Sequence, residues 1–223
     1  MKRRIIALLF GIGLLLFGGI VYTTAIKPPS VTPSDAIALM TAGDYEIYES
    51  GVLYAAQGQV SVNGNSFEDL LTNYTRSLRK VGDVYVYHDR VQYKTNGRTV
   101  WGFEIHVVLQ GGSVAGYAIV NGTRYDITSM EWQNKTMIRL DELVSFIRSG
   151  YQARLRGMLE KSQLSEKTSW LDISGRTYEG TYAGHMITFR EQFSGGNLES
   201  VDIKLILSRN STVNVMIRSV AGS

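Results

Sequence analysis

The hydrophobic pattern divides the chain into an unbroken apolar segment near its start and a longer region in which apolar residues recur at short intervals. Residues 5–26 carry no charge, follow Lys2, Arg3 and Arg4, and precede Lys27. As a helix this segment would be about 33 Å long, enough to cross the hydrocarbon core of a bilayer. Because the basic residues come first, the positive-inside rule places the N-terminus in the cytoplasm and the rest of the chain outside. We therefore expect contact with the lipid bilayer through residues 5–26.

A cleaved signal peptide is the alternative interpretation of this segment. Small residues at Thr23-Thr24-Ala25 would permit cleavage after Ala25, although the apolar segment is longer than the ~7–15 residues usual for a signal peptide. In that case the protein is secreted, and both alternatives export the remainder. The prolines lie at positions 28, 29 and 33, which indicates a stiff spacer. We divide the chain into an anchor or signal (1–27), a Pro-rich spacer (28–33) and a single extracytoplasmic domain (34–223).

Beyond the spacer, the pattern predicts mostly strands. Aromatic and β-branched residues alternate with polar ones, and Asn- and Gly-rich turns separate the runs, as is typical of antiparallel hairpins. Strands are predicted over 45–62 (one bent strand or two), 84–94, 98–110, 114–120, 123–132, 170–173, 177–182, 185–193, 198–207 and 212–220.

Helical spacing of apolar residues predicts three helices in the exported domain. A short helix begins near Pro33 and ends before Gly43, and a second is predicted over 66–80 because Ser66 and Asp69 resemble a capping box. The main helix is predicted over 139–163, with a bend possible at Gly150. The expected fold is therefore α+β: an N-terminal transmembrane helix, then a mostly antiparallel, twisted β-sheet domain with one long and two shorter helices packed on it.

Charge and composition narrow the function classes. The formal net charge is +3 with a pI near 9.0, and Lys2, Arg3 and Arg4 account for all of it, because 23 − 3 = 20 basic residues then face 20 acidic ones. The basic pI is thus a topology signal, and we expect no nucleic-acid partner. The absence of cysteine excludes disulfides, Cys-ligated zinc, iron–sulfur clusters and thiol catalysis.

Sequons for N-glycosylation provide a second sign of export. Disulfides usually accompany such sequons in exported eukaryotic proteins, so their combination with no cysteine favours an archaeal cell surface. A Gram-positive envelope with accidental sequons is the second choice. The candidate glycosylation sites are Asn73, Asn121, Asn134 and Asn210.

Motifs for catalysis are absent or incomplete. The histidines His88, His106 and His185 lack metal-binding spacing, and Ser77 to Lys80 fits the S-x-x-K pattern without its companion motifs. Gly111-Gly112-Ser113 is predicted to be a hairpin turn, and no phosphate-binding or calcium-binding loop is present. We predict no catalytic residue, no metal site and no cofactor. An envelope hydrolase would need a cleft that unites at least two of His88, His106, His185 and Ser113 with a carboxylate.

Two groups of side chains are candidate binding surfaces. The basic side of the main helix would face anionic lipid or a partner, or simply be solvated: Arg139, Arg148, Arg154, Arg156 and Lys161. Rings that alternate along the first strands would line one sheet face and bind an apolar or sugar ligand, or form the ordinary sheet core under the main helix. These candidate ligand-facing aromatics are Tyr85, Tyr87, Trp101, Phe103 and Tyr117.

These observations favour a membrane-anchored extracytoplasmic binding or scaffolding module of the cell envelope, which associates with an envelope protein or with itself. One alternative is an envelope carrier of lipid or another apolar ligand. The order of predicted elements is compatible with the helix-covered half-barrel of exported carriers of the lipoprotein-sorting kind, although no motif assigns the chain to them. The other alternative is a surface filament subunit that donates a strand.

Overall fold

The computed structural model describes residues 32–62, 65–167 and 174–220, and for residues 56–68 it describes no side chains. The predicted anchor at 5–26 and the predicted strand at 170–173 lie outside the described residues. Among the described helices, none is both long and apolar enough to cross a membrane.

The described residues form one antiparallel sheet of eleven strands in the order β6-β5-β4-β3-β2-β1-β11-β10-β9-β8-β7. Two meanders meet at its centre, where β1 pairs with β11 from Tyr45 opposite Ser219 to Val52 opposite Thr212. The first meander comprises β1 (Tyr45–Val62), β2 (Asn65–Val81), β3 (Val84–Thr95), β4 (Arg98–Gln110), β5 (Ser113–Val120) and β6 (Thr123–Asp126). The second comprises β7 (Gln163–Glu166), β8 (Gly175–Tyr182), β9 (His185–Ser194), β10 (Asn197–Ser208) and β11 (Ser211–Ser219).

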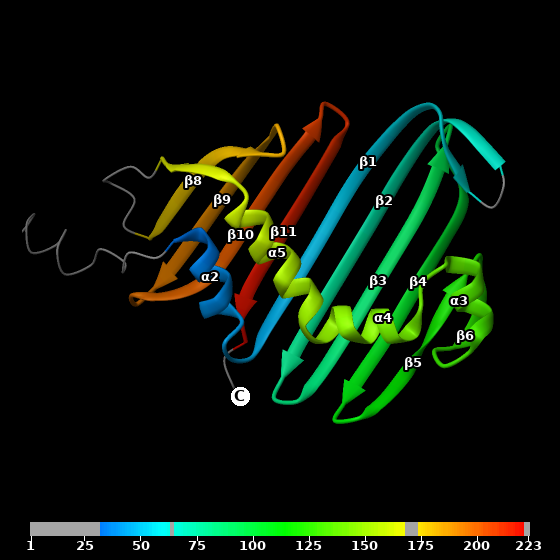
Figure 1. The fold of residues 1–223 in the computed structure, drawn as a ribbon, viewed down its shortest axis with the longest axis horizontal. Coiled ribbons are helices and arrows are strands. Elements are labelled where there is room, and N and C mark those ends of the chain that lie inside the picture. The colour runs from blue at the N-terminus through cyan, green and yellow to red at the C-terminus, as the bar shows by residue number, and fades with distance from the viewer. Residues whose placement is uncertain (1–31, 63–64, 168–173, 221–223) are drawn as a thin grey trace, which may run out of the picture.

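Helices cover one face of this sheet, which we call the helix face; the opposite face is the outer face. Figure 1 shows α2, α4 and α5 on the same side of the strands, with α5 running diagonally across them. The helical elements are α2 (Pro33–Met40), α3 (Met130–Thr136), α4 (Leu140–Ser145), the π-helical turn η1 (Phe146–Gly150) and α5 (Tyr151–Glu160). The predicted α+β class with dominant strands is confirmed for the described part.

The π-helical turn follows from the spacing of the apolar residues. Leu143, Ile147, Tyr151, Leu155 and Leu159 are all buried, and each lies four residues after the previous one. An α-helix has about 3.6 residues per turn, so a spacing of four advances the stripe by about 40° each time. A π-helical turn contains more residues and therefore corrects this drift. The helix has such a turn at Phe146–Gly150. Gly150, where the sequence allows a bend, is the last residue of this turn, and the helix continues in α geometry from Tyr151.

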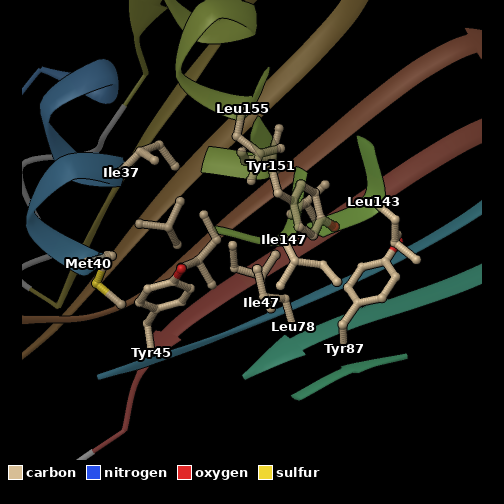
Figure 2. Close-up of a cluster of buried hydrophobic side chains, with 14 of the residues drawn as sticks. Ile37, Met40, Tyr45, Ile47, Leu78, Tyr87, Leu143, Ile147, Tyr151 and Leu155 are labelled. Atoms are coloured by element: carbon tan, nitrogen blue, oxygen red, sulfur yellow. The ribbon is translucent and has the colours of Figure 1, made fainter. Parts of the chain in front are cut away.

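The main core lies between these helices and the sheet half nearest the β2–β3 turn. Figure 2 shows Ile47, Leu78 and Tyr87 of the sheet against Ile147 and Leu155 of the helices. Each of these side chains is at most 2% exposed. Burying an aliphatic or aromatic side chain of this size contributes about 1.5–3 kcal/mol. The long helix is therefore held by a filled core along this half of the sheet.

The helix predicted over 66–80 is wrong, because this segment is strand β2. Leu70, Tyr74 and Leu78 are four residues apart, a spacing that fits one face of a helix and equally one face of a strand. Pairing with β1 on one side and β3 on the other decides the outcome. Thr72, Asn73 and Thr75 also have low helix propensity.

The strand predicted over 123–132 is too long, and α3 was not predicted. Strand β6 ends at Asp126, and Ser129 then caps α3 by accepting a hydrogen bond from the Glu131 amide at 3.1 Å. Trp132 is fully buried and donates its Nε1 hydrogen to the Ile127 carbonyl at 2.8 Å. This indole docks α3 at the edge of the sheet. Strand β7 was also not predicted, since the main helix was extended to 163.

Candidate functional site

A buried carboxylate lies at the centre of the helix face. The Glu49 side chain is 1% exposed, and its Oε1 accepts a hydrogen bond from the Tyr74 hydroxyl at 2.8 Å. Its Oε2 accepts one from the Tyr151 hydroxyl at 2.5 Å and another from Arg154 Nη2. Strand β1 supplies the acid, β2 supplies one phenol, and α5 supplies the other phenol and the guanidinium. We call Glu49, Tyr74, Tyr151 and Arg154 the polar cluster.

Local backbone choices bring these side chains together. Gly51 is on the helix face of β1, opposite Tyr74, and a Cβ at Gly51 would lie 2.2 Å from Cε1 of the Tyr74 ring. The missing side chain therefore lets this ring lie against β1 and reach Glu49. On the helical side, η1 turns Tyr151 toward the sheet, where its ring stacks on Phe146 with centroids 5.1 Å apart.

A second buried ion pair supports the polar cluster. Arg76 Nη2 lies 2.8 Å from Asp89 Oδ2, and the Tyr87 hydroxyl donates to the same oxygen at 3.1 Å. The Arg76 guanidinium also lies over the Tyr151 ring, with Cζ 5.8 Å from its centroid. Two acids and two guanidinium groups thus share this region and balance in formal charge. Buried charges require this kind of pairing, because desolvating an unpaired ion costs several kcal/mol.

The phenols of this region remain protonated donors at neutral pH. Burial raises the pKa of Tyr74 and of Tyr151, and the nearby Glu49 charge raises both further. Burial and the Asp89 charge raise the pKa of Tyr87 in the same direction. Each phenol therefore holds its proton and donates it in a hydrogen bond to a carboxylate.

A cavity of about 210 Å³ adjoins the polar cluster between α5 and the sheet. Glu49, Tyr74 and Arg154 line one part of its wall. The remaining lining is largely apolar and comes from α5, β8, β10 and β11: Leu155, Met158, Tyr182, Ile203, Leu205, Val213 and Val215. An apolar wall with a few convergent polar groups is typical of small-molecule sites. Such a site can hold an apolar chain and fix the orientation of one polar end.

The aromatic residues predicted to face a ligand do not share one surface. Tyr87 is 1% exposed and Trp101 is 8% exposed, and both belong to the hydrophobic core. Tyr85 and Phe103 are partly buried against it, on the same sheet face. The prediction that Tyr117 shares this surface is wrong. Tyr117 pairs with His106 on the outer face, where the Arg124 guanidinium lies over its ring. The cavity is lined by other residues.

The candidate catalytic residues are only partly brought together: His88 and His106 are neighbours on the outer face beside Glu104, and the others lie apart from them. His88 Nε2 lies 3.2 Å from Glu104 Oε1 on the outer face, close to His106, whereas His185 begins β9 and Ser113 begins β5. Ser77 and Lys80 are three positions apart on β2, so the strand directs them to opposite faces. Within the described residues, no group of three or more His, Asp or Glu side chains is arranged to hold a metal ion.

The four sequon asparagines lie in different settings. Asn121 is in the β5–β6 turn with φ 48°, and Asn210 is exposed in the β10–β11 turn. Asn134 is exposed on α3. Asn73 lies within β2, paired with Val52 and Gln92, and its Oδ1 is buried. The first three are placed where a glycan can attach, whereas the strand setting of Asn73 is unfavourable.

The basic side of the main helix has no uniform role. Arg139 pairs with Asp141 at 2.9 Å, and Arg156 pairs with Glu160 at 3.0 Å, both on the surface. Arg148 donates to the Gly111 carbonyl at 2.7 Å. Arg154 differs from them because it reaches the buried Glu49 and lines the cavity.

Glu49 was not predicted to be a site residue, although its position in the sequence indicates that it is buried. Tyr45, Ile47, Glu49 and Gly51 alternate on one face of β1, and an acid in such an apolar row requires a buried partner. The partners Tyr151 and Arg154 are 102 and 105 positions away in the chain, so only the fold identifies them.

No protein-family model matches this chain, and no curated protein sequence matches it either. The fold and the cavity define a class of architecture. It is a broad antiparallel sheet with helices on one face and a largely apolar cavity beneath one of these helices. Function is therefore inferred from the geometry of that pocket.

Proposed function

We propose that this protein is a membrane-anchored, extracytoplasmic binding module whose ligand is a molecule with an apolar chain, such as a lipid of the cell envelope. The cavity beside α5 is the observation that supports this proposal most directly. Its wall is largely apolar, and residues of the polar cluster form one part of it. Export and anchoring rest on the apolar segment at 5–26 and the basic residues before it.

The division of the helix face into two halves supports a binding role. Under η1 and the start of α5, side chains such as Ile47 and Leu78 are fully buried. Further along α5, Leu205 and Val213 are on the same sheet face, but they border open volume. A protein that needed only stability would gain by filling this volume, because each cavity in a core is destabilising. An open apolar volume therefore favours a ligand.

The experiment fills the cavity and measures bound lipid. The full chain is purified in amphipol, and apolar molecules are extracted and quantified by mass spectrometry. Val213→Phe places a ring in the cavity, whereas Thr212→Phe makes the same change on the outer face of the same strand. We expect the native chain and Thr212→Phe to carry an extracted chain, and Val213→Phe to lose most of it while it still unfolds cooperatively. Equal amounts in a folded Val213→Phe variant would contradict the proposal.

Docking of a protein partner is a second candidate function, favoured by a separate groove. A hollow of about 1020 Å³ lies between α3, α4 and β5, with Val114, Leu140 and Val144 among its lining. Met130 and Met137 flank it and are 65% and 86% exposed. Exposed methionines suit adaptable protein contacts.

Site-specific crosslinking tests this second function. A photoreactive residue is placed at 130 or 137, and at 216 on the outer face as a control, since Met216 is 36% exposed. A single crosslinked product from 130 and 137 in native membranes, absent from 216, is expected. Equal products from all three positions would exclude a specific partner at the groove.

A further inference from the structure

The polar part of the cavity has unused hydrogen-bond donors. The Arg154 side chain is 46% exposed, and its guanidinium lies over the Tyr151 ring with Cζ 5.0 Å from the centroid. One N–H of Nη2 donates to Glu49. Within the described part of the chain, the rest of the guanidinium fork has no hydrogen-bond acceptor. An arginine fork matches the paired oxygens of a carboxylate or phosphate.

The acceptor capacity of the same site is nearly exhausted. A carboxylate offers about four lone-pair sites, and Glu49 already accepts from Tyr74, Tyr151 and Arg154. Its side chain is also 1% exposed, so it offers a cationic group almost no accessible surface. The polar capacity that remains at the cavity is therefore for an acceptor.

Although the formal charges of this region balance, the group that a ligand can reach is a cation. The guanidinium groups of Arg76 and Arg154 both approach the Tyr151 ring, with Cζ 5.8 Å and 5.0 Å from its centroid. The charge of Glu49 is shared among three donors, and that of Asp89 is shared between Arg76 and the Tyr87 hydroxyl. The half-exposed Arg154 is thus the charged group of this region that a ligand can reach.

We propose that the ligand of this cavity is a single-chain amphiphile with an anionic head, a carboxylate or a phosphate, and that Arg154 binds this head. The inference rests on the proposed function, since the chain must occupy the apolar part of the cavity. A volume of about 210 Å³ takes on the order of seven groups the size of a water molecule, at about 30 Å³ each. That is room for part of one chain.

A series of photoreactive probes tests the head group on the native protein. Four dodecyl probes carry the same diazirine in the chain and differ in the head: carboxylate, phosphate, hydroxyl or trimethylammonium. The full chain in amphipol is labelled, and the half-saturating concentration is measured for peptides from α5, β10 and β11. We expect the carboxylate or phosphate probe to saturate at a concentration about tenfold or more below that of the alcohol, as for a charge-assisted hydrogen bond. Of these two anionic probes, the one with the lower half-saturating concentration indicates whether the ligand is a fatty acid or a phosphate-bearing lipid.

Variants of the helix then assign the preference to one residue. Arg154→Gln is expected to raise the half-saturating concentration of the anionic probes to that of the alcohol. Arg156→Gln is the matched control, because Arg156 is two residues further along α5 and pairs with Glu160 outside the cavity. If Arg154→Gln fails to unfold cooperatively, the double variant Glu49→Gln/Arg154→Gln removes both charges and should lose the preference in the same way.

The outcomes separate this inference from the proposed function. Labelling of α5, β10 and β11 with the same half-saturating concentration for all four heads would overturn the anionic ligand and leave the apolar-chain site intact. A preference for trimethylammonium would also overturn it. No labelling of these peptides by any probe would overturn both.

Discussion

Two acids are buried equally on the helix face and have different surroundings. The exposed fraction is 1% for Glu49 on β1 and 0% for Glu191 on β9. Glu49 accepts three hydrogen bonds, including one from a guanidinium group. Glu191 Oε2 lies 3.5 Å from the Tyr178 hydroxyl and 4.0 Å from Arg176 Nη1, and its Oε1 has no partner within the described residues.

The difference indicates which acid belongs to a binding site. Burial raises the pKa of Glu191 to about 7, because its contacts compensate poorly for lost water. Glu49 instead organises donors from β2 and α5 at the wall of a cavity. Burial alone therefore does not identify a functional acid; the number of convergent donors and an adjoining open volume do.

Removing the well-paired acid should have the largest effect on stability. Glu49→Ala leaves Arg154 and two phenols without their acceptor, and we expect the free energy of unfolding to fall by about 3–5 kcal/mol. Glu46→Ala is the matched control, since Glu46 is on the outer face of the same strand and pairs with Arg218 on the surface. That pair should contribute less than about 1 kcal/mol. Chemical denaturation compares the two variants, and equal losses would refute the special role of Glu49.

Neutralising the poorly paired acid should have an opposite and smaller effect that depends on pH. The folded pKa of Glu191, about 7, exceeds the ordinary value of 4.5. Between these values the unfolded chain loses the proton while the folded chain keeps it, so the free energy of unfolding falls as pH rises. Glu191→Gln removes this loss, and we expect it to stabilise the protein by about 2 kcal/mol at pH near 7.5 and little at pH near 4.5.

Denaturation midpoints at both pH values check this prediction. A Glu191→Gln variant whose advantage is the same at both pH values would show that Glu191 does not titrate in this window. Asp202→Asn provides a comparison, because burial also raises the pKa of Asp202, on the outer face of β10, while Arg190 opposes the rise.

The sequence predicts those parts of this architecture that depend on local signals. Asn–Gly turns, such as the one at Asn96 and Gly97, mark the hairpins, since both residues have positive φ. Most strands from β3 onward were therefore placed correctly. The segment at Leu70, Tyr74 and Leu78 was not, because a spacing of four fits two structures and only pairing with β1 and β3 decides between them.

The site is less predictable than the fold. An acid at position 49 and a glycine at 51 are visible in the alternating pattern of β1, but their meaning depends on Tyr74 and on a helix about 100 positions away. Close contacts between distant segments leave no periodic trace in a single sequence. The predicted aromatic surface failed for a related reason: alternation places Tyr87 and Tyr117 on opposite faces only once the register between β3, β4 and β5 is known.

The smallest predicted effect tests whether the donors of Glu49 act separately. Tyr74→Phe removes one of its three hydrogen bonds, while Tyr151 and Arg154 remain. Because Tyr74 lines the cavity, water can replace its hydroxyl, and we expect a loss of about 1 kcal/mol in the free energy of unfolding. Tyr48→Phe, exposed on the outer face of β1, should change it by less than about 0.5 kcal/mol.

A double-mutant cycle with Glu49→Gln makes this test sharper. The coupling energy between Tyr74 and Glu49 should account for most of the loss, because the phenol acts through the carboxylate. A loss of about 1 kcal/mol without coupling would mean that the ring packs over Gly51 for stability alone. In that case only the α5 donors, Tyr151 and Arg154, would stabilise the Glu49 carboxylate. The difference in pairing between Glu49 and Glu191 would then come from these two residues.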